Sequence, residues 1–383
     1  TGGYLDFSGT LHHRLRAAGL PAARFEMIVR SDGWQWAWNG KAENQPPDLF
    51  PKTVWPENQL RYNGHYPWGD ETVISYSVQG RPVLESPTLE RMGNVPVIHH
   101  RLSIRPGSNS LELIVLDDLP EIRGKTATTG HSIAWLQTKD ERVRFRSSEN
   151  GKLVLQIPPS EQPLHLNVAV THDESDSVKE QKPSHQVVNL LERTKGGPRR
   201  WETTHTLKGR LATSTFQGYA MDSVTVPLKN AYNSWMRTSS LAFFPDGKLA
   251  VGTLPGDVWI VSGINDELDQ VTWQRFAAGL YEPLGMKVVD GVLTAITRGR
   301  IVKLHDYNQD GEADFYEAFF NEDEPDKGWH AYNFDLEVGK DGSFYYGRTG
   351  GFSQWSVPGG VVKVSADGKS SKVLGAGLRV PNG

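Results

Sequence analysis

Residues 301–320 read IVKLHDYNQDGEADFYEAFF, and Asp306 to Glu317 within them have the spacing of a twelve-residue calcium loop. Oxygen-bearing side chains occupy the first, third, fifth, ninth and twelfth places, and Gly311 occupies the sixth, where such a loop bends sharply. The seventh place contributes a backbone carbonyl. The predicted metal ligands are therefore Asp306, Asn308, Asp310, Glu312, Asp314 and Glu317. The competing interpretation is an acidic, solvated turn that binds no ion.

The segments on either side of this loop indicate strands. Residues 301–305 and 315–320 are short runs rich in β-branched or aromatic side chains, without the period of an amphipathic helix. A calcium sensor of the EF-hand type would place helices there. We therefore expect a structural Ca²⁺ ion that stabilises a β fold.

Composition sets the limits for the rest of the chain. The 383 residues are 37% hydrophobic and 10% aromatic, which is enough to fill the cores of two domains. The formal net charge of -4, with both signs mixed, argues against a nucleic-acid partner. Cysteine is absent, which excludes disulfides, thiol nucleophiles and covalent haem attachment within this chain. No apolar run is long enough for a membrane span, and the N-terminus lacks a signal peptide, so we expect a piece of a longer polypeptide.

Residues 1–171 alternate apolar and polar positions between turns, which predicts an antiparallel, β-sandwich-like domain that lacks its own N-terminal part. The segment from Trp34 to Trp68 has little periodicity and is predicted to be a long packed loop; its tryptophans could fill a core or stack on a sugar. His99 and His100 lie in a predicted strand and should face opposite sides, so they are poorly placed to share a metal ion. Residues 172–205 are polar and form the predicted linker, with a short helix around 187–193.

Residues 206–383 contain a degenerate repeat. Asp-Gly turns begin at Asp246, Asp290 and Asp341, and each joins two strand-like runs that are followed by a third and a fourth. Four strands in roughly 40 to 50 residues are typical of a propeller blade. The fold is therefore predicted to be all-β, with the sandwich followed by about three blades. Because a ring needs roughly four to eight blades, we expect the rest of the polypeptide or another chain to supply the remaining ones.

Several motifs together resemble a known family. They are GDVWIVSG (256–263), EPLGMKVVDG (282–291), the calcium loop, DGSFYYG (341–347) and GLRVPNG (377–383), with TGGYLDFSGT (1–10) and VISYSVQGRPVLESP (73–87) in the first half. The family comprises large secreted propeller proteins of planctomycete-type bacteria, labelled membrane-bound dehydrogenase-like. The resemblance implies a periplasmic or cell-surface location, sequence beyond both ends and an accompanying c-type cytochrome module.

The blades more distantly resemble the soluble quinoprotein glucose and sorbosone dehydrogenases, which hold pyrroloquinoline quinone over the propeller channel. That resemblance implies His330 as the general base and Arg379 and Asn382 as cofactor contacts. Arg348 and Arg298 follow blade strands at corresponding turns, so we expect at least one arginine per blade at the same mouth, able to contact an anionic cofactor. The structural alternatives are a histidine that only packs and arginines that only pair with carboxylates. Asp257 is predicted to cap a turn.

Two functional hypotheses follow. The first is a calcium-stabilised propeller oxidoreductase that acts on a sugar or another alcohol and passes electrons to a cytochrome. The second is a non-catalytic module that binds a glycan or other protein chains at the cell surface. A hydrolase or lyase using His330 has no nucleophile motif to support it.

Overall fold

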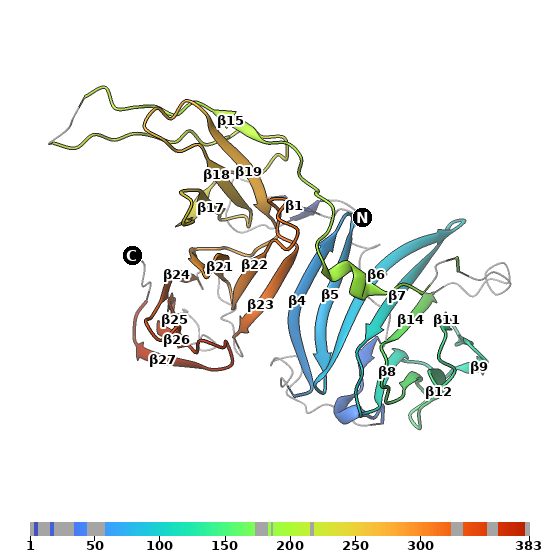
Figure 1. Ribbon diagram of the computed structural model, residues 1–383. Coiled ribbons are helices and arrows are strands. Elements are labelled where there is room, and N and C mark those ends of the chain that lie inside the picture. The colour runs from blue at the N-terminus through green and yellow to red at the C-terminus, as the bar shows by residue number, and fades with distance from the viewer. Residues whose placement is uncertain are drawn as a thin grey trace. The chain divides into compact units, whose positions relative to one another are not determined.

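The computed structural model describes residues 4–6, 16–18, 34–43, 58–172, 183–184, 187–214, 218–322, 332–350 and 359–379. The chain forms two compact units, residues 1–197 and residues 198–383. Within the described ranges both units are built from antiparallel strands, and the helical elements are the short 3₁₀ turns η1 (Trp38–Gly40) and η2 (Leu190–Thr194) (Figure 1). The all-β prediction is confirmed. None of the described helices is long and apolar enough to cross a membrane.

The first unit contains two large antiparallel sheets and one short strand pair. One sheet has the order β4-β5-β6-β7-β14-β11-β10-β9, and the other has the order β12-β13-β8-β3. The strands are β1 (Tyr4–Asp6), β2 (Arg16–Ala18), β3 (Gln35–Trp36), β4 (Leu60–Trp68), β5 (Glu71–Val78), β6 (Arg81–Met92), β7 (Val95–Ile104), β8 (Leu111–Leu116), β9 (Glu121–Arg123), β10 (Thr126–Thr128), β11 (Ile133–Thr138), β12 (Arg144–Ser147), β13 (Leu153–Ile157) and β14 (Leu164–Thr171).

The core of the first unit lies between these two sheets. Leu102 and Leu166 from the larger sheet and Leu113 and Leu155 from the smaller one are fully buried in a single hydrophobic cluster. Side chains alternate between the two faces of a strand, so these leucines share the inner faces of their sheets. Several of their neighbours on the opposite faces, among them Ser103, Ile114 and Asn167, are buried as well. This packing is the predicted sandwich arrangement.

Two parts of the expected loop between Trp34 and Trp68 are instead strands, the two-residue β3, which pairs with β8, and the longer β4. β4 (Leu60–Trp68) pairs along its length with β5, and the register shifts between Tyr62 and Gly64. Such a bulge places two residues opposite one, so the alternation that marks a strand in sequence is broken. Pro67 weakens the strand signal in the sequence further, since proline is rare inside sheets. The predicted helix around 187–193 is η2, capped by the Asn189 side chain, which accepts a bond from the Leu191 amide.

Among its described residues, the second unit contains three antiparallel sheets in consecutive order along the chain. They have the orders β15-β19-β18-β17-β16, β20-β21-β22-β23 and β24-β25-β26-β27. The strands are β15 (His205–Leu207), β16 (Thr238–Phe243), β17 (Leu249–Thr253), β18 (Val258–Ser262), β19 (Val271–Ala277), β20 (Gly285–Val289), β21 (Val292–Thr297), β22 (Arg300–His305), β23 (Phe315–Asn321), β24 (Asn333–Val338), β25 (Phe344–Arg348), β26 (Gly360–Val364) and β27 (Ser371–Ala376).

The edge strands β16, β20 and β24 of the three sheets lie beside one another, as blades around an axis require. The Ser240 hydroxyl on β16 donates to the Pro283 carbonyl just before β20, at 2.8 Å, and the Asp335 amide on β24 donates to the Leu284 carbonyl at 3.3 Å. Apolar layers fill the spaces between successive sheets; Ala250 and Leu293 lie in one, and Ile296 and Phe344 in the next. These three sheets are the predicted blades, and all three Asp-Gly turns join the expected strands.

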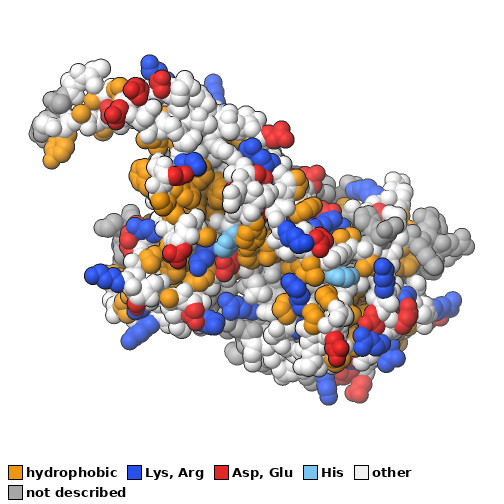
Figure 2. Space-filling view, in the orientation of Figure 1, with side chains coloured by type: hydrophobic (Ala, Val, Ile, Leu, Met, Phe, Trp, Pro, Cys, Tyr) orange, Lys and Arg blue, Asp and Glu red, His pale blue; other side chains and the backbone are white. Residues whose placement is uncertain are grey.

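The first blade has two additions that its sequence repeat does not show. β15 extends the sheet beyond β19, so this blade has five strands. In addition, Val224, Val226 and Tyr232 pack on the face that includes Trp259. Leu241 and Phe243, on β16, remain 60% and 65% exposed. On the side of the molecule shown in Figure 2, acidic and basic side chains are interspersed, in keeping with the mixed composition.

Candidate metal centre

The predicted calcium loop connects the two outer strands of the second blade. It leaves β22 at His305 and enters β23 at Phe315, and the Asp314 amide donates to the His305 carbonyl at 2.7 Å. The flanking runs are thus strands, as predicted. The strand pair fixes both ends of the loop.

Side-chain oxygens inside the loop are held by its own backbone amides. The two oxygens of Asp306 accept from the amides of Asp310 at 3.2 Å and Gly311 at 2.9 Å. Oδ2 of Asp314 accepts from the Tyr307 amide at 2.7 Å and from the Asn308 amide at 3.2 Å. The loop backbone is therefore wrapped around its carboxylates, and their positions are set by main-chain contacts.

Two more predicted ligands complete this network. Asp310 Oδ1 accepts from the Glu312 amide at 2.9 Å, and Asn308 Oδ1 accepts from the Asp310 amide at 3.1 Å. Burial raises the pKa of Asp306, and the negative charges of Asp310 and Asp314 raise it further, although the Gly311 amide acts in the opposite direction. These carboxylates are close enough to repel one another, and a bound cation would relieve that repulsion.

Gly311 is at a position that a larger residue would disturb. Its φ angle is 87°, in the left-handed region, and an added Cβ would lie 2.4 Å from Nε2 of Gln274. The same Nε2 donates to the Gly311 carbonyl at 3.0 Å. The glycine predicted at the bend is thus required by the backbone conformation and by the approach of β19.

The twelfth residue of the loop has a protein partner. Glu317 Oε2 lies 2.7 Å from His305 Nε2, and the His305 ring stacks on Tyr307 and Phe315. Within the described ranges, no three His, Asp or Glu side chains form a group arranged to hold a metal ion. For Glu317 to close a metal shell, its carboxylate would have to exchange His305 for the ion.

Arginines lie at one end of the second and third blades. The Arg298 amide donates to the Tyr281 carbonyl at 3.0 Å, and its guanidinium donates to the Tyr281 hydroxyl at 2.8 Å. Glu282 lies 3.6 Å from the same guanidinium, and burial raises the pKa of this carboxyl. The Arg298 guanidinium also lies over the ring of Tyr332, which precedes β24.

The predicted register of these arginines is off by one residue. Arg298 and Thr349 each follow the last residue of their blade's second strand, and their amides donate to Tyr281 and Tyr332, which lie before β20 and β24. Thr349 is therefore the counterpart of Arg298. Arg348 is the buried last residue of β25. Leu254 occupies the same place in the first blade, which excludes one arginine per blade at this position.

Of the remaining residues predicted to serve the cofactor, Arg379 is described by the structure, and two others are not. The Arg379 carbonyl accepts from the Gly350 amide at 3.0 Å, which brings residue 379 to the same end of the third blade as Thr349. His330 and Asn382 lie outside the described residues. The structure thus brings Arg298, Arg348 and the Arg379 backbone to neighbouring strand ends.

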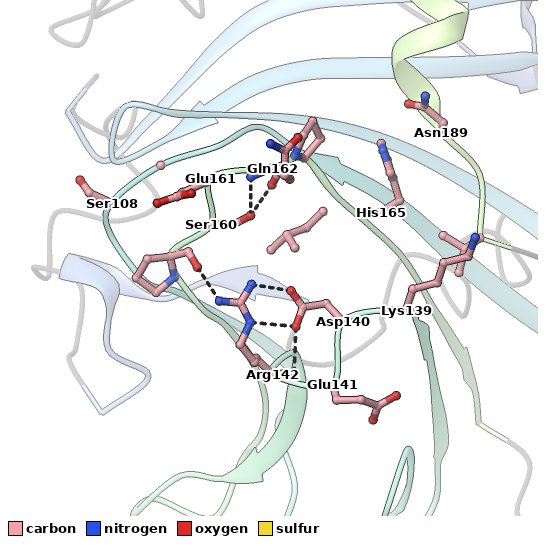
Figure 3. Close-up of a pocket in the computed structure, with 15 residues that line it drawn as sticks. Ser108, Lys139, Asp140, Glu141, Arg142, Ser160, Glu161, Gln162, His165 and Asn189 are labelled. Carbon is pink, nitrogen blue, oxygen red and sulfur yellow. Dashed lines mark hydrogen bonds and ion pairs between the residues drawn. The ribbon is translucent and has the colours of Figure 1, made fainter.

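A separate cavity of about 1210 Å³ lies in the first unit (Figure 3). Along one wall, Arg142 forms a two-pronged pair with Asp140, at 3.0 Å from Nε and 2.6 Å from Nη2. His165 and Asn189 lie at the other end in Figure 3. Polar and apolar residues line the cavity together, and its Arg142 is already paired with a carboxylate.

Residues 1–85 match a domain of unknown function, DUF6797. No protein of curated function matches the sequence. Among solved structures, the chain is similar to a candidate oxidoreductase (glucose dehydrogenase) from Thermus thermophilus, with 17% sequence identity and a TM-score of 0.28. The similar region covers 38% of this chain and 53% of that chain, so it spans about half of the Thermus protein. This is a distant similarity.

Several polar contacts near the blades could not be predicted from their sequence. Asp257 does not use its carboxylate to cap the turn: it accepts from the Ser234 hydroxyl and pairs with Arg275 at 2.5 Å. A buried carboxylate needs a charged or hydrogen-bonding partner, so when no arginine or lysine is near it in the sequence, its partner must come from a distant part of the chain. In the first unit, His99 and His100 contact different carboxylates, as their opposite orientation predicts.

Proposed function

We propose that residues 306–317 bind one Ca²⁺ ion that stabilises the second blade. The observation that carries this proposal is the loop backbone, whose amides already hold Asp306 and Asp314 in place beside the sharp bend at Gly311. Calcium prefers six to eight oxygen ligands in a flexible arrangement, and this stretch supplies carboxylate, amide and carbonyl oxygens. The ion would neutralise the mutual repulsion of the carboxylates.

The ligand set follows from residue type and place in the loop. Side-chain oxygens of Asp306, Asn308 and Asp310 and the backbone carbonyl of Glu312 would contact the ion. Asp314 would act at the ninth place, directly or through water, and Glu317 would contribute last, on release from His305. The role of the ion is structural, since the loop joins two strands and no helix pair could open.

Unfolding in denaturant with and without calcium tests this proposal. Saturating Ca²⁺ at 100 times the dissociation constant should add about 2.7 kcal/mol to the free energy of unfolding relative to chelator. D306N should lose most of that gain. D367N is the matched control, because Asp367 accepts from the Lys369 amide in a surface turn outside the loop. Equal calcium responses in wild type and D306N would reject the site.

We propose oxidation of a sugar or another alcohol as a second candidate function. Its support is the gathering of Arg298, Arg348 and the Arg379 segment at neighbouring strand ends, where an anionic cofactor such as pyrroloquinoline quinone would find positive charge. When bound, the quinone would accept the hydride. His330 would serve as base, Asn382 as a further contact, and a c-type cytochrome as the electron acceptor in the periplasm.

The alternative candidate is a non-catalytic assembly or glycan-binding module at the cell surface. The exposed Leu241 and Phe243 on the first blade favour contact with further blades, and the cavity beside Arg142, with its mixed polar and apolar lining, suits a neutral glycan. Dye reduction with added quinone, Ca²⁺ and a panel of sugars separates the two candidates. Reduction that R298A abolishes supports the oxidoreductase. No reduction, with an unchanged melting temperature in quinone, supports the module.

A further inference from the structure

The side chain of Glu312 points away from the loop's other carboxylates. Only its backbone carbonyl is a predicted ligand, and the residue as a whole is only 4% exposed. Its carboxylate accepts from the Arg200 amide at 2.9 and 3.1 Å and from the Trp201 amide at 2.7 Å. One residue of the loop therefore contacts the ion site through its backbone and a distant segment through its side chain.

The segment that Glu312 holds, residues 199–201, lies at the start of the second unit. The guanidinium groups of Arg199 and Arg200 approach the same carboxylate, at 3.6 and 3.8 Å. Two guanidinium groups lie over the Trp201 ring, that of Arg200 at 4.2 Å and that of Arg275 at 4.7 Å from its centre. Backbone, charge and ring contacts therefore all depend on where Glu312 is placed.

We propose that calcium in the loop controls protease access to the Arg199–Arg200 site through Glu312. This inference rests on the proposed calcium site. With the ion bound, the Glu312 carbonyl is fixed and its side chain keeps the Arg200 and Trp201 amides occupied. Without the ion, repulsion among Asp306, Asp310 and Asp314 loosens the loop and releases the segment. A protease needs its substrate strand extended, with free backbone amides, so the released segment is cleaved faster.

Limited trypsin digestion, read by mass spectrometry, measures this coupling on the whole chain. The readout is the cleavage rate after Arg199 and Arg200 divided by the rate after Lys369. Lys369 lies in the turn between β26 and β27, with its side chain 69% exposed, and this ratio also corrects for effects of calcium on trypsin itself. Replacing saturating Ca²⁺ by chelator should raise the ratio about ten-fold, as expected when cleavage follows local opening.

The variant E312A separates the coupling from metal binding. It keeps the backbone carbonyl but removes the side-chain oxygens that accept from the Arg200 and Trp201 amides. Calorimetry should therefore show a Ca²⁺ affinity within about three-fold of wild type, whereas the cleavage ratio should be high even in Ca²⁺. E337A is the control, because Glu337 is exposed and pairs with Lys287 on the blade surface. It should behave like wild type.

The outcomes are distinguishable. If Ca²⁺ binds but the cleavage ratio is the same in Ca²⁺ and chelator, or if E312A matches wild type, the proposed coupling is wrong and the calcium site is unaffected. If calorimetry shows no Ca²⁺ binding, both the proposed calcium site and the proposed coupling are wrong.

Discussion

Replacing Gly311 by alanine should destabilise the protein even without calcium. At a φ of 87°, an alanine in the left-handed region costs about 1–2 kcal/mol. Its Cβ would also lie 2.4 Å from Gln274 Nε2, so Gln274 must move and give up its bond to the Gly311 carbonyl, which adds about 0.5–1.5 kcal/mol. The expected loss in the free energy of unfolding of the second unit is therefore about 2–3 kcal/mol.

Gly247 provides a matched control for this prediction. It has a φ of 85°, and nothing lies within 4 Å of an added Cβ. G247A should therefore show only the conformational cost of about 1–2 kcal/mol. Denaturant unfolding in chelator, with Q274A added to G311A as a double-mutant cycle, isolates the side-chain contact. If G311A is no more destabilising than G247A, the packing of Gln274 against the loop is wrong.

Three further changes test other parts of the account. D257N removes the negative charge that Arg275 faces in a mostly buried pair, so the free energy of unfolding in denaturant should fall by about 3–5 kcal/mol. A loss below about 1 kcal/mol would contradict a buried pair. Burial and the charge of Lys139 lower the pKa of His165, so the unfolded chain binds a proton more readily than the folded chain. The melting temperature should therefore fall as the pH drops below about 6.5, and it should fall less steeply in H165N. G285A places a Cβ 2.3 Å from the Asp335 backbone, so separating β20 from β24 should cost about 1–3 kcal/mol, whereas an unchanged midpoint would mean that these strands are not adjacent.

The fold could be predicted where the sequence signal is local. Asp-Gly turns and alternating strands indicated the blades, and the spacing of oxygen-bearing residues indicated the loop between β22 and β23. β4 was not predicted because its bulge at Gly64 breaks the alternation of inward and outward side chains. β15 was not predicted because a strand of three residues is too short to show an alternating pattern, and its position depends on its pairing with β19.

The candidate site was predictable in its ligands but not in its surroundings. The partners of Glu312 and Asp257 are more than ten residues away, so no local spacing connects them. The same holds for Gln274, which approaches Gly311 from another blade. Arg298 follows the end of β21 whereas Arg348 is the last residue of β25, and the exact end of a strand cannot be read from the sequence, so only the backbone bonds show which residues correspond.

Isothermal titration of Ca²⁺ into chelator-treated protein tests the central claim most directly. One ion per chain should bind to the wild type, and the variant that combines D306N with D310N should show no binding in the same concentration range. Wild-type protein that takes up no Ca²⁺, or a double variant that binds as tightly as the wild type, would contradict a calcium-stabilised blade.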